Sequence, residues 1–199
     1  MTGPAGADRR ALLVVDVQTD FCPGGALAVP AGDGVIPPLN RVIEQAHTRG
    51  WAVYASRDWH PPDSGHFAAF GGRWPVHCVA GSPGAAFARD LRLPADAIVI
   101  SKGRSRADDG YSAFEGTTDS GRLLVDDLKG RRIERLYVGG LATDYCVRAS
   151  VLDACRAGLD VAVLTDAVAG LDPDGARRAL RDMQAAGARS TGSSALEVF

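Results

Sequence analysis

Short apolar runs and amphipathic stretches alternate along most of this chain. The apolar runs are nearly continuous, which is typical of strands buried on both faces of a parallel sheet. Six strands are predicted, at Ala11–Val17, Trp51–Ser56, Ala97–Ile100, Ile133–Val138, Asp160–Thr165 and Ala188–Thr191.

Four helices are predicted between these strands, over Asp33–His47, from Asp119 or Ser120 to Leu128, over Asp144–Ala157, and from Asp172 to about Ala186. Pro37 and Pro38 fit only near the start of the first helix, so its first turn is expected to be irregular. The alternation predicts an α/β fold, a doubly wound and mainly parallel six-stranded sheet with helices on both faces.

The overall composition is that of an ordinary globular protein. The 199 residues, 46% hydrophobic and 23% charged, predict one domain over 1–199, with a flexible tail at 1–10. The net charge of -2 and the lack of a long apolar run indicate no nucleic-acid or membrane partner, and leave a homo-oligomer open. Four scattered cysteines without a CxxC motif indicate reduced thiols and a cytoplasmic location.

One of these cysteines, Cys146, stands at a predicted strand-to-helix turn, after Gly139 and Gly140. Thr143 or Asp144 can cap the helix, and the positive end of a helix favours a thiolate, the nucleophilic form of cysteine. A small turn also exposes backbone N–H groups to a substrate carbonyl, as acyl transfer requires. The alternative is an inert buried cysteine.

Two further polar residues end apolar strands. Asp16 closes the first strand and Lys102 follows the third. Such a carboxylate is costly to bury without a partner, and a lysine there is a compact charge whose pKa can be tuned. The alternatives are a turn aspartate and a solvated loop lysine. Because the carboxyl ends of parallel strands share one side of a sheet, Asp16, Lys102 and Cys146 are expected to meet at one crevice.

Three of the four histidines lie in one irregular segment, 57–94, interpreted as an insertion that carries a metal site and a lid. His60, His66 and His77 are accompanied there by Asp58, which shares a face with His60 if the chain is extended. Nitrogen and oxygen ligands without sulfur suit Zn, Fe(II) or Mn(II). Hydrogen-bonded loop histidines without a metal are the alternative.

These residues stand in a set of motifs that resembles one family over about Ala11 to Ser190. The chain is similar to the nicotinamidases of the isochorismatase-like cysteine hydrolase superfamily. The Asp/Lys/Cys set indicates the superfamily, and the Asp-x-His…His…His set indicates the nicotinamidase branch. The motifs are Asp16-Val17-Gln18-x-Asp20-Phe21, Asp58-Trp59-His60 with His66-Phe67, Trp74-Pro75-x-His77-Cys78-Val79-x-Gly81, Lys102-Gly103, Tyr111-Ser112-Ala113-Phe114 and Gly140-Leu141-Ala142-Thr143-Asp144-Tyr145-Cys146-Val147.

The resemblance implies a reaction and a set of catalytic roles. Nicotinamide would be hydrolysed to nicotinate and ammonia through a thioester on Cys146, and pyrazinamide would also be accepted. Asp16 would transfer protons and Lys102 would stabilise charge. The backbone N–H groups of Ala142 and Cys146 would form the oxyanion hole, and the Leu141–Ala142 peptide would be cis.

The resemblance also implies one divalent metal ion, no organic cofactor and a small-molecule substrate. Asp58, His60 and His77 would hold the metal, with His66 as a further ligand, and the metal would bind the pyridine nitrogen. Phe21, Trp74 and Tyr111 would line the ring pocket. The loop from Arg104 to Asp109 departs from the family pattern, which affects lid closure but no motif residue.

Two other functions remain open from the sequence. The same three catalytic residues would suit another small amide, such as an N-carbamoyl or ureido compound. A non-catalytic domain that binds a metal or ligand is the second alternative. A dinucleotide site has little support, because Gly32-Asp33-Gly34 does not directly follow a strand.

Overall fold

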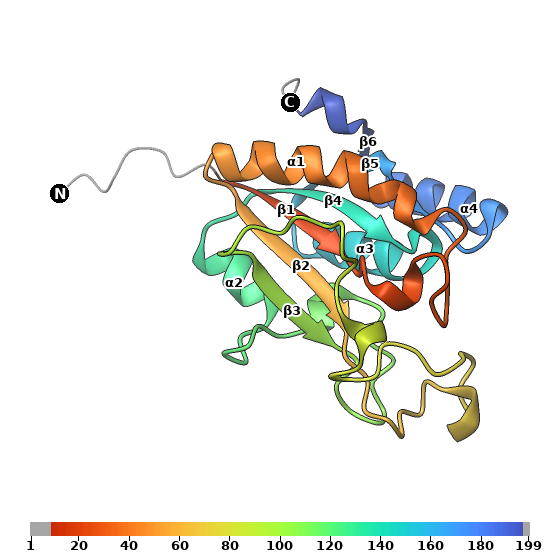
Figure 1. Ribbon diagram of the computed structural model, residues 1–199. Coiled ribbons are helices and arrows are strands. Elements are labelled where there is room, and N and C mark those ends of the chain that lie inside the picture. Colours follow the sequence, from red (N-terminus) through yellow and green to blue (C-terminus); the bar gives the residue numbers. More distant parts are fainter. Residues whose placement is uncertain (1–8, 197–199) are drawn as a thin grey trace.

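The computed structural model describes residues 9–196. A six-stranded sheet forms its centre (Figure 1). The elements follow in the order β1 (Arg10–Val15), α1 (Ile36–Thr48), β2 (Ala52–Asp58), β3 (Ile98–Lys102), α2 (Leu124–Gly130), β4 (Arg135–Leu141), α3 (Arg148–Arg156), β5 (Asp160–Ala169), α4 (Pro173–Ala185) and β6 (Arg189–Thr191).

The strand order is β3-β2-β1-β4-β5-β6, and all five described pairings are parallel. The chain winds outward from β1 to one edge, then returns to β4 and winds to the other edge. The point of reversal lies between β1 and β4, and in such sheets the crevice beyond the carboxyl ends at that point is where ligands bind. The predicted doubly wound sheet is confirmed.

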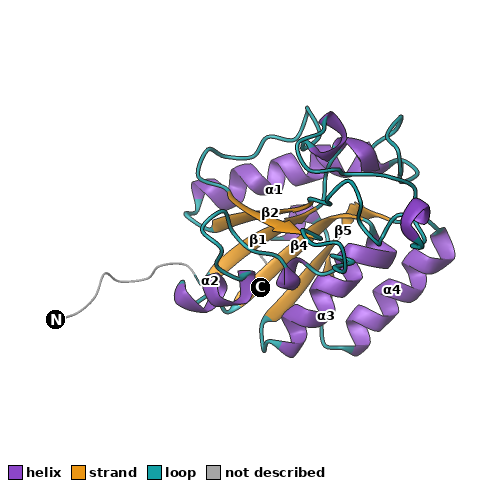
Figure 2. Cartoon of the chain, turned by 90° about the horizontal axis from the view of Figure 1, so that it is seen from below, coloured by secondary structure: helices purple, strands orange, loops and turns teal. Residues whose placement is uncertain are grey.

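Two apolar layers cover the two faces of the sheet. Leu39, Val42 and Ile43 on α1 pack with one face, including Leu12 and Val14 of β1. The alternate β1 residues point to the other face because side chains along a strand alternate, and they pack there with α2, α3 and α4. Figure 2 shows α1 on one side of the sheet and the other three helices opposite.

Several predicted boundaries need correction. The irregular start of the first helix is present as a 3₁₀ turn, Gly32–Val35, before α1. The second helix begins at Leu124, so neither Asp119 nor Ser120 caps it. Thr117 pairs with Ser101 and Leu123 and holds that stretch in a turn.

The strand predicted to end at Thr165 extends to Ala169, past a register shift opposite β4. The tail predicted over 1–10 lies outside the described residues up to 8, and Arg10 already belongs to β1. The predicted insertion over 57–94 overlaps the last two residues of β2 and otherwise forms the long connection to β3. Within residues 9–196 no helix has the length and apolarity needed to cross a membrane.

Candidate functional site

The structure brings Asp16, Lys102 and Cys146 together at the carboxyl ends of the central strands. Asp16 follows β1 directly, Lys102 is the last residue of β3, and Cys146 lies in the turn after β4. Lys102 Nζ lies 2.8 Å from Asp16 Oδ2 and 3.5 Å from Cys146 Sγ. The Ser56 hydroxyl donates to the other Asp16 oxygen at 2.7 Å. The three groups can therefore exchange protons and charge at close range.

Burial dominates the electrostatics of these groups. It raises the pKa of the Asp16 carboxyl above its ordinary value, against the opposing effect of Lys102. It also raises the pKa of the Cys146 thiol well above the ordinary value, again opposed by Lys102. Burial alone would lower the pKa of Lys102, but the facing carboxylates of Asp16 and Asp58 raise it well above its usual value. Burial thus favours the neutral form of the Cys146 thiol, whereas the two carboxylates favour the charged form of Lys102.

The expected capping of the helix that carries Cys146 needs correction. The residues from Thr143 to Val147 form a π-helical turn, in which the Val147 N–H reaches back to the Ala142 carbonyl at 3.2 Å. Neither Thr143 nor Asp144 caps this turn. The Asp144 carboxylate instead accepts from the N–H groups of residues 171 and 172, which ties the turn to the start of α4.

The backbone that leads into this turn has two unusual features. The Leu141–Ala142 peptide is cis, as the resemblance implied. Gly140 has a φ of +127°, and a Cβ there would lie 2.0 Å from the carbonyl oxygen of Val15. Glycine is therefore required for the turn to lie against the end of β1.

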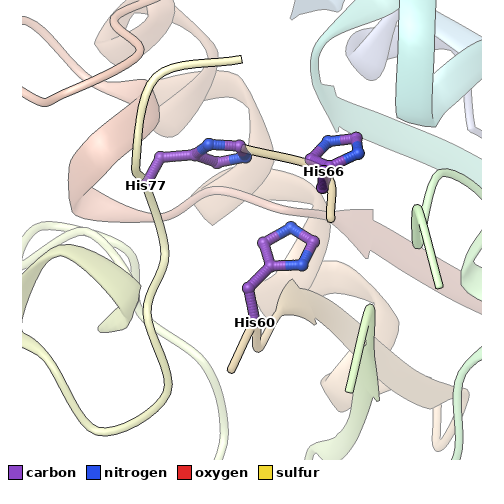
Figure 3. Close-up of side chains that lie close together, drawn as sticks. All are labelled: His60, His66 and His77. Atoms are coloured by element: carbon purple, nitrogen blue, oxygen red, sulfur yellow. The ribbon is translucent and has the colours of Figure 1, made fainter. Parts of the chain in front are cut away.

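His60, His66 and His77 converge beside these groups, and Figure 3 shows their rings facing a common point. One ring nitrogen from each lies within 4.8 Å of the others. All three are buried. The Nδ1 atoms lie against acceptors outside the cluster: the carbonyls of Gly103 and Pro75 at 3.1 and 2.7 Å for His60 and His77, and the Asp109 carboxylate at 3.1 Å for His66. An Nδ1–H that donates outward leaves the Nε2 lone pair for a metal.

Asp58 lies between two of the histidines and the Lys102 ammonium group. Its Oδ2 lies 3.6 Å from His60 Nε2 and 3.8 Å from His77 Nε2, and its Oδ1 accepts from Lys102 Nζ. Burial opposes ionisation of this carboxyl, but Lys102 and the two histidines hold its pKa well below the ordinary value. The Asp58 carboxylate thus lies beside two of the three imidazoles, those of His60 and His77.

These residues fit a divalent metal ion. His60 Nε2 is a buried nitrogen with no hydrogen-bond partner among the described residues, as a metal ligand would be before its ion binds. The donor set, nitrogen and oxygen without sulfur, suits Zn, Fe(II) or Mn(II). His66, expected only as a further ligand, stands with His60 and His77 on equal terms.

A small cavity lies over Cys146, and four aromatic side chains are among the residues that line it. The expected ring residues Phe21, Trp74 and Tyr111 all line it. Trp74 Nε1 donates to the Tyr111 hydroxyl at 2.9 Å, which joins two loops at its rim. Tyr145 was not expected there, yet it lines the cavity and packs edge-on against Trp74, with ring centroids 4.9 Å apart. Its position next to Cys146 in the sequence could have indicated that Tyr145 lines the cavity.

Gln18 and Asp20 support the site in a way that the sequence did not indicate. The Gln18 amide accepts from the Asp58 N–H at 2.8 Å and donates to the Asp58 carbonyl at 2.9 Å. Asp20 accepts from the Cys78 N–H at 2.7 Å, next to His77. Both belong to the motif that begins at Asp16, so the end of β1 holds the metal candidates in place as well.

Comparison with known proteins shows which family has this fold and sequence. The isochorismatase domain model matches residues 10–195. The chain belongs to the isochorismatase family. It is 44% identical to the nicotinamidase of Escherichia coli over 90% of this chain and 92% of that protein. It is 39% identical to the nicotinamidase/pyrazinamidase of Mycobacterium tuberculosis over 89% of this chain and 95% of that one.

The structural comparison agrees. A crystal structure of the Pyrococcus horikoshii pyrazinamidase in complex with zinc has a TM-score of 0.87 and 44% sequence identity, covering 93% of this chain and 99% of that chain. The predicted membership of the isochorismatase-like superfamily, and the resemblance to its nicotinamidase branch, are confirmed.

Proposed function

We propose that this isochorismatase-family protein hydrolyses nicotinamide to nicotinate and ammonia through a thioester on Cys146. The observation that carries the proposal is the position of Asp58. One oxygen of its carboxylate contacts Lys102 and the other faces two histidines. The proposed nucleophile, Cys146, and two of the candidate metal ligands, His66 and His77, line the same cavity. The relatives named above, nicotinamidases and a pyrazinamidase, support the same substrate class.

Proton transfer from Cys146 to Asp16 begins the proposed reaction. The Asp16 carboxylate lies within 4.8 Å of the Cys146 sulfur, and its raised pKa suits it to accept the thiol proton. The thiolate would then attack the carboxamide carbon, and the carbonyl oxygen would gain negative charge. The N–H groups of Ala142 and Cys146 are the proposed donors to this oxyanion. Lys102 would stabilise the negative charge that moves between Cys146 and Asp16.

Collapse of the tetrahedral intermediate would break the C–N bond. Asp16 would return its proton to the departing nitrogen, which leaves as ammonia, and a thioester would remain on Cys146. Asp16, again ionised, would take a proton from a water molecule that attacks this thioester. The C–S bond then breaks, nicotinate leaves, and the thiol regains its proton.

His60, His66, His77 and Asp58 are the residues that would hold one divalent metal ion. When bound, the ion would supply a Lewis-acid partner for the pyridine nitrogen of the substrate. The aromatic walls from Phe21, Trp74 and Tyr111 would hold the ring flat, with its carboxamide toward Cys146. Recognition through a ring nitrogen would also admit pyrazinamide. No organic cofactor is needed for these steps.

The test is ammonia release from nicotinamide by the purified protein, before and after treatment with a strong chelator, with metal content measured on the same samples. Release should stop on chelation and return when Zn²⁺, Fe²⁺ or Mn²⁺ is added back. A metal-loaded sample that releases no ammonia contradicts the proposed substrate. N-carbamoyl and ureido compounds would then be assayed with the same protein. Release that persists in metal-free protein contradicts the metal requirement.

A further inference from the structure

Two loops that are distant in sequence meet at the rim of the cavity. One is the connection after β2, which carries His66. The other follows Lys102 and runs to Tyr111. Asp109 on the second loop contacts His66 on the first, with its Oδ1 3.1 Å from His66 Nδ1. Asp109 also lines the cavity. Asp109 is thus the carboxylate of the second loop that contacts a metal candidate, while the Gly103 carbonyl of the same loop contacts His60.

His66 differs from the other two histidines in what holds it. His60 and His77 lie against main-chain carbonyls, which no substitution of a side chain removes. The ring of His66 depends on the Asp109 side chain. It otherwise only packs against rings, with centroids 5.0 Å from His60 and 5.3 Å from Tyr111. Such packing limits where the imidazole lies but does not select which ring nitrogen carries the proton.

We propose that Asp109 is a positioning residue that recruits His66 as a third histidine ligand of the metal site. The inference rests on the proposed function, since it concerns the metal site of that function. A carboxylate that accepts from Nδ1–H holds the imidazole in the tautomer with a free Nε2 lone pair. It also increases the basicity of that lone pair. Without the carboxylate, His66 can turn or protonate at Nε2 and leave the metal with fewer ligands.

Other bonds hold the second loop in place without Asp109. The Gly65 N–H donates to the Arg106 carbonyl at 2.8 Å, and Trp74 donates to Tyr111 as described. Lys102 Nζ also donates to the Gly110 carbonyl. The Asp109 side chain is 68% exposed, so its removal leaves no buried hole. Variants at this position are therefore expected to fold with the loop in place.

The experiment measures Zn²⁺ affinity of the full-length protein by competition with a chromogenic chelator, in the absence of substrate. Asp109→Ala should weaken binding by about 10- to 100-fold, the range typical for loss of such a partner. Asp109→Asn should retain most of the affinity, because its amide oxygen still accepts from Nδ1–H. Asp63→Asn is the matched control, since it removes an exposed charge from the same region. If all three variants lose the same amount of Zn²⁺ affinity, the proposal is overturned, because the loss then reflects only the removal of a negative charge.

A second measurement tests whether Asp109 acts through His66. In a His66→Ala background, Asp109→Ala should cause no further loss of Zn²⁺ affinity. The absorption spectrum of the Co²⁺-loaded protein should change in the same way in both single variants, because both lose the same ligand. Additive losses, or a Co²⁺ spectrum unchanged by Asp109→Ala, would overturn the proposal. The proposal would also be overturned if the unchanged protein bound no Zn²⁺. A protein that binds Zn²⁺ as expected but releases no ammonia contradicts the proposed function alone.

Discussion

Lys102 and Asp58 form a buried ion pair in which Lys102 Nζ lies 2.5 Å from Asp58 Oδ1. The same ammonium group lies 2.8 Å from the Asp16 carboxylate. One cation therefore separates two carboxylates that are both almost fully shielded from water. The two carboxylates lie within 4.8 Å of each other. Without the Lys102 cation they could not both stay ionised, because like charges repel strongly in a site of low polarity.

Lys102→Met should therefore destabilise the protein as well as inactivate it. Removal of one partner from a buried ion pair typically costs about 3–5 kcal/mol, because a charge remains uncompensated. Unfolding in urea and ammonia release from nicotinamide would measure the two effects. Lys129→Met, at the other lysine of the chain, is the control, because Lys129 is exposed on α2. If the two variants unfold at the same urea concentration, the ion pair is not the stabilising element inferred here.

Cys146→Ala should abolish turnover and leave metal binding intact. Loss of a nucleophile typically costs at least about 10⁴-fold in rate, and the histidine cluster does not include Cys146. Ammonia release and metal content would be measured on the same preparation. Cys155→Ala, on α3, should behave as the unchanged protein. Residual turnover near that of the unchanged protein in Cys146→Ala would rule out the proposed thioester.

The hydrogen bond between Trp74 and Tyr111 makes a prediction about substrate binding. Trp74→Phe and Tyr111→Phe each keep an aromatic wall but remove this bond. A hydrogen bond of this kind contributes about 1 kcal/mol, which corresponds to an increase in KM of about 5-fold with a smaller change in kcat. The double variant should be little worse than either single one. Fully additive effects would show that the two side chains act separately.

A second buried contact, remote from the cavity, predicts how stability depends on pH. The Tyr54 hydroxyl on β2 donates to Asp127 Oδ2 on α2 at 2.7 Å. Although burial opposes ionisation of Asp127, the bonds from Tyr54 and Arg131 lower its pKa below the ordinary value. Because the pKa of Asp127 is lower in the folded state than in the unfolded state, its ionised form stabilises the fold at pH values above the unfolded pKa of about 3.9. This stabilisation is lost as the pH falls toward the folded-state pKa.

Tyr54→Phe should therefore reduce the free energy of unfolding by about 1.5–3 kcal/mol at pH 7, the range for hydrogen bonds to charged groups. The difference should shrink below about pH 4, as Asp127 becomes protonated. Urea unfolding at several pH values measures this. Asp126→Asn is the control, because Asp126 is the exposed neighbour on the same helix. A difference that does not vary with pH would show that Tyr54 stabilises through packing alone.

Much of the fold follows from local pattern. The apolar runs predicted all six strands, because a strand that is buried on both faces is recognisable from its own nearly continuous run of apolar residues. The parallel arrangement then predicted that Asp16, Lys102 and Cys146 would share one side of the sheet. The start of the second helix was predicted wrongly, because that prediction also relied on local sequence signals alone. Local capping signals at Asp119 and Ser120 suggested a start, whereas pairing of Thr117 with Ser101 and Leu123 holds that stretch as a turn.

The chemistry of the site was less accessible from the sequence. The sequence predicts a capped helix start at Thr143 or Asp144, but the residues from Thr143 to Val147 form a π-helical turn without a side-chain cap. The sequence offers Asp144 as one of two caps, yet its carboxylate accepts from the N–H groups of residues 171 and 172, just before α4. Both expectations considered only neighbours in the chain. The deciding partners come from other strands and helices.

Periodicity and residue type were enough to establish the order of the elements and which reactive groups end the central strands, because these are properties of short segments. They could not establish that the Asp58 carboxylate accepts from Lys102, or that Asp109 reaches His66. Those contacts join residues more than 40 positions apart in sequence, or depend on the path of irregular loops. No local preference fixes such a path; it follows from the packing of the loops against the sheet and against each other.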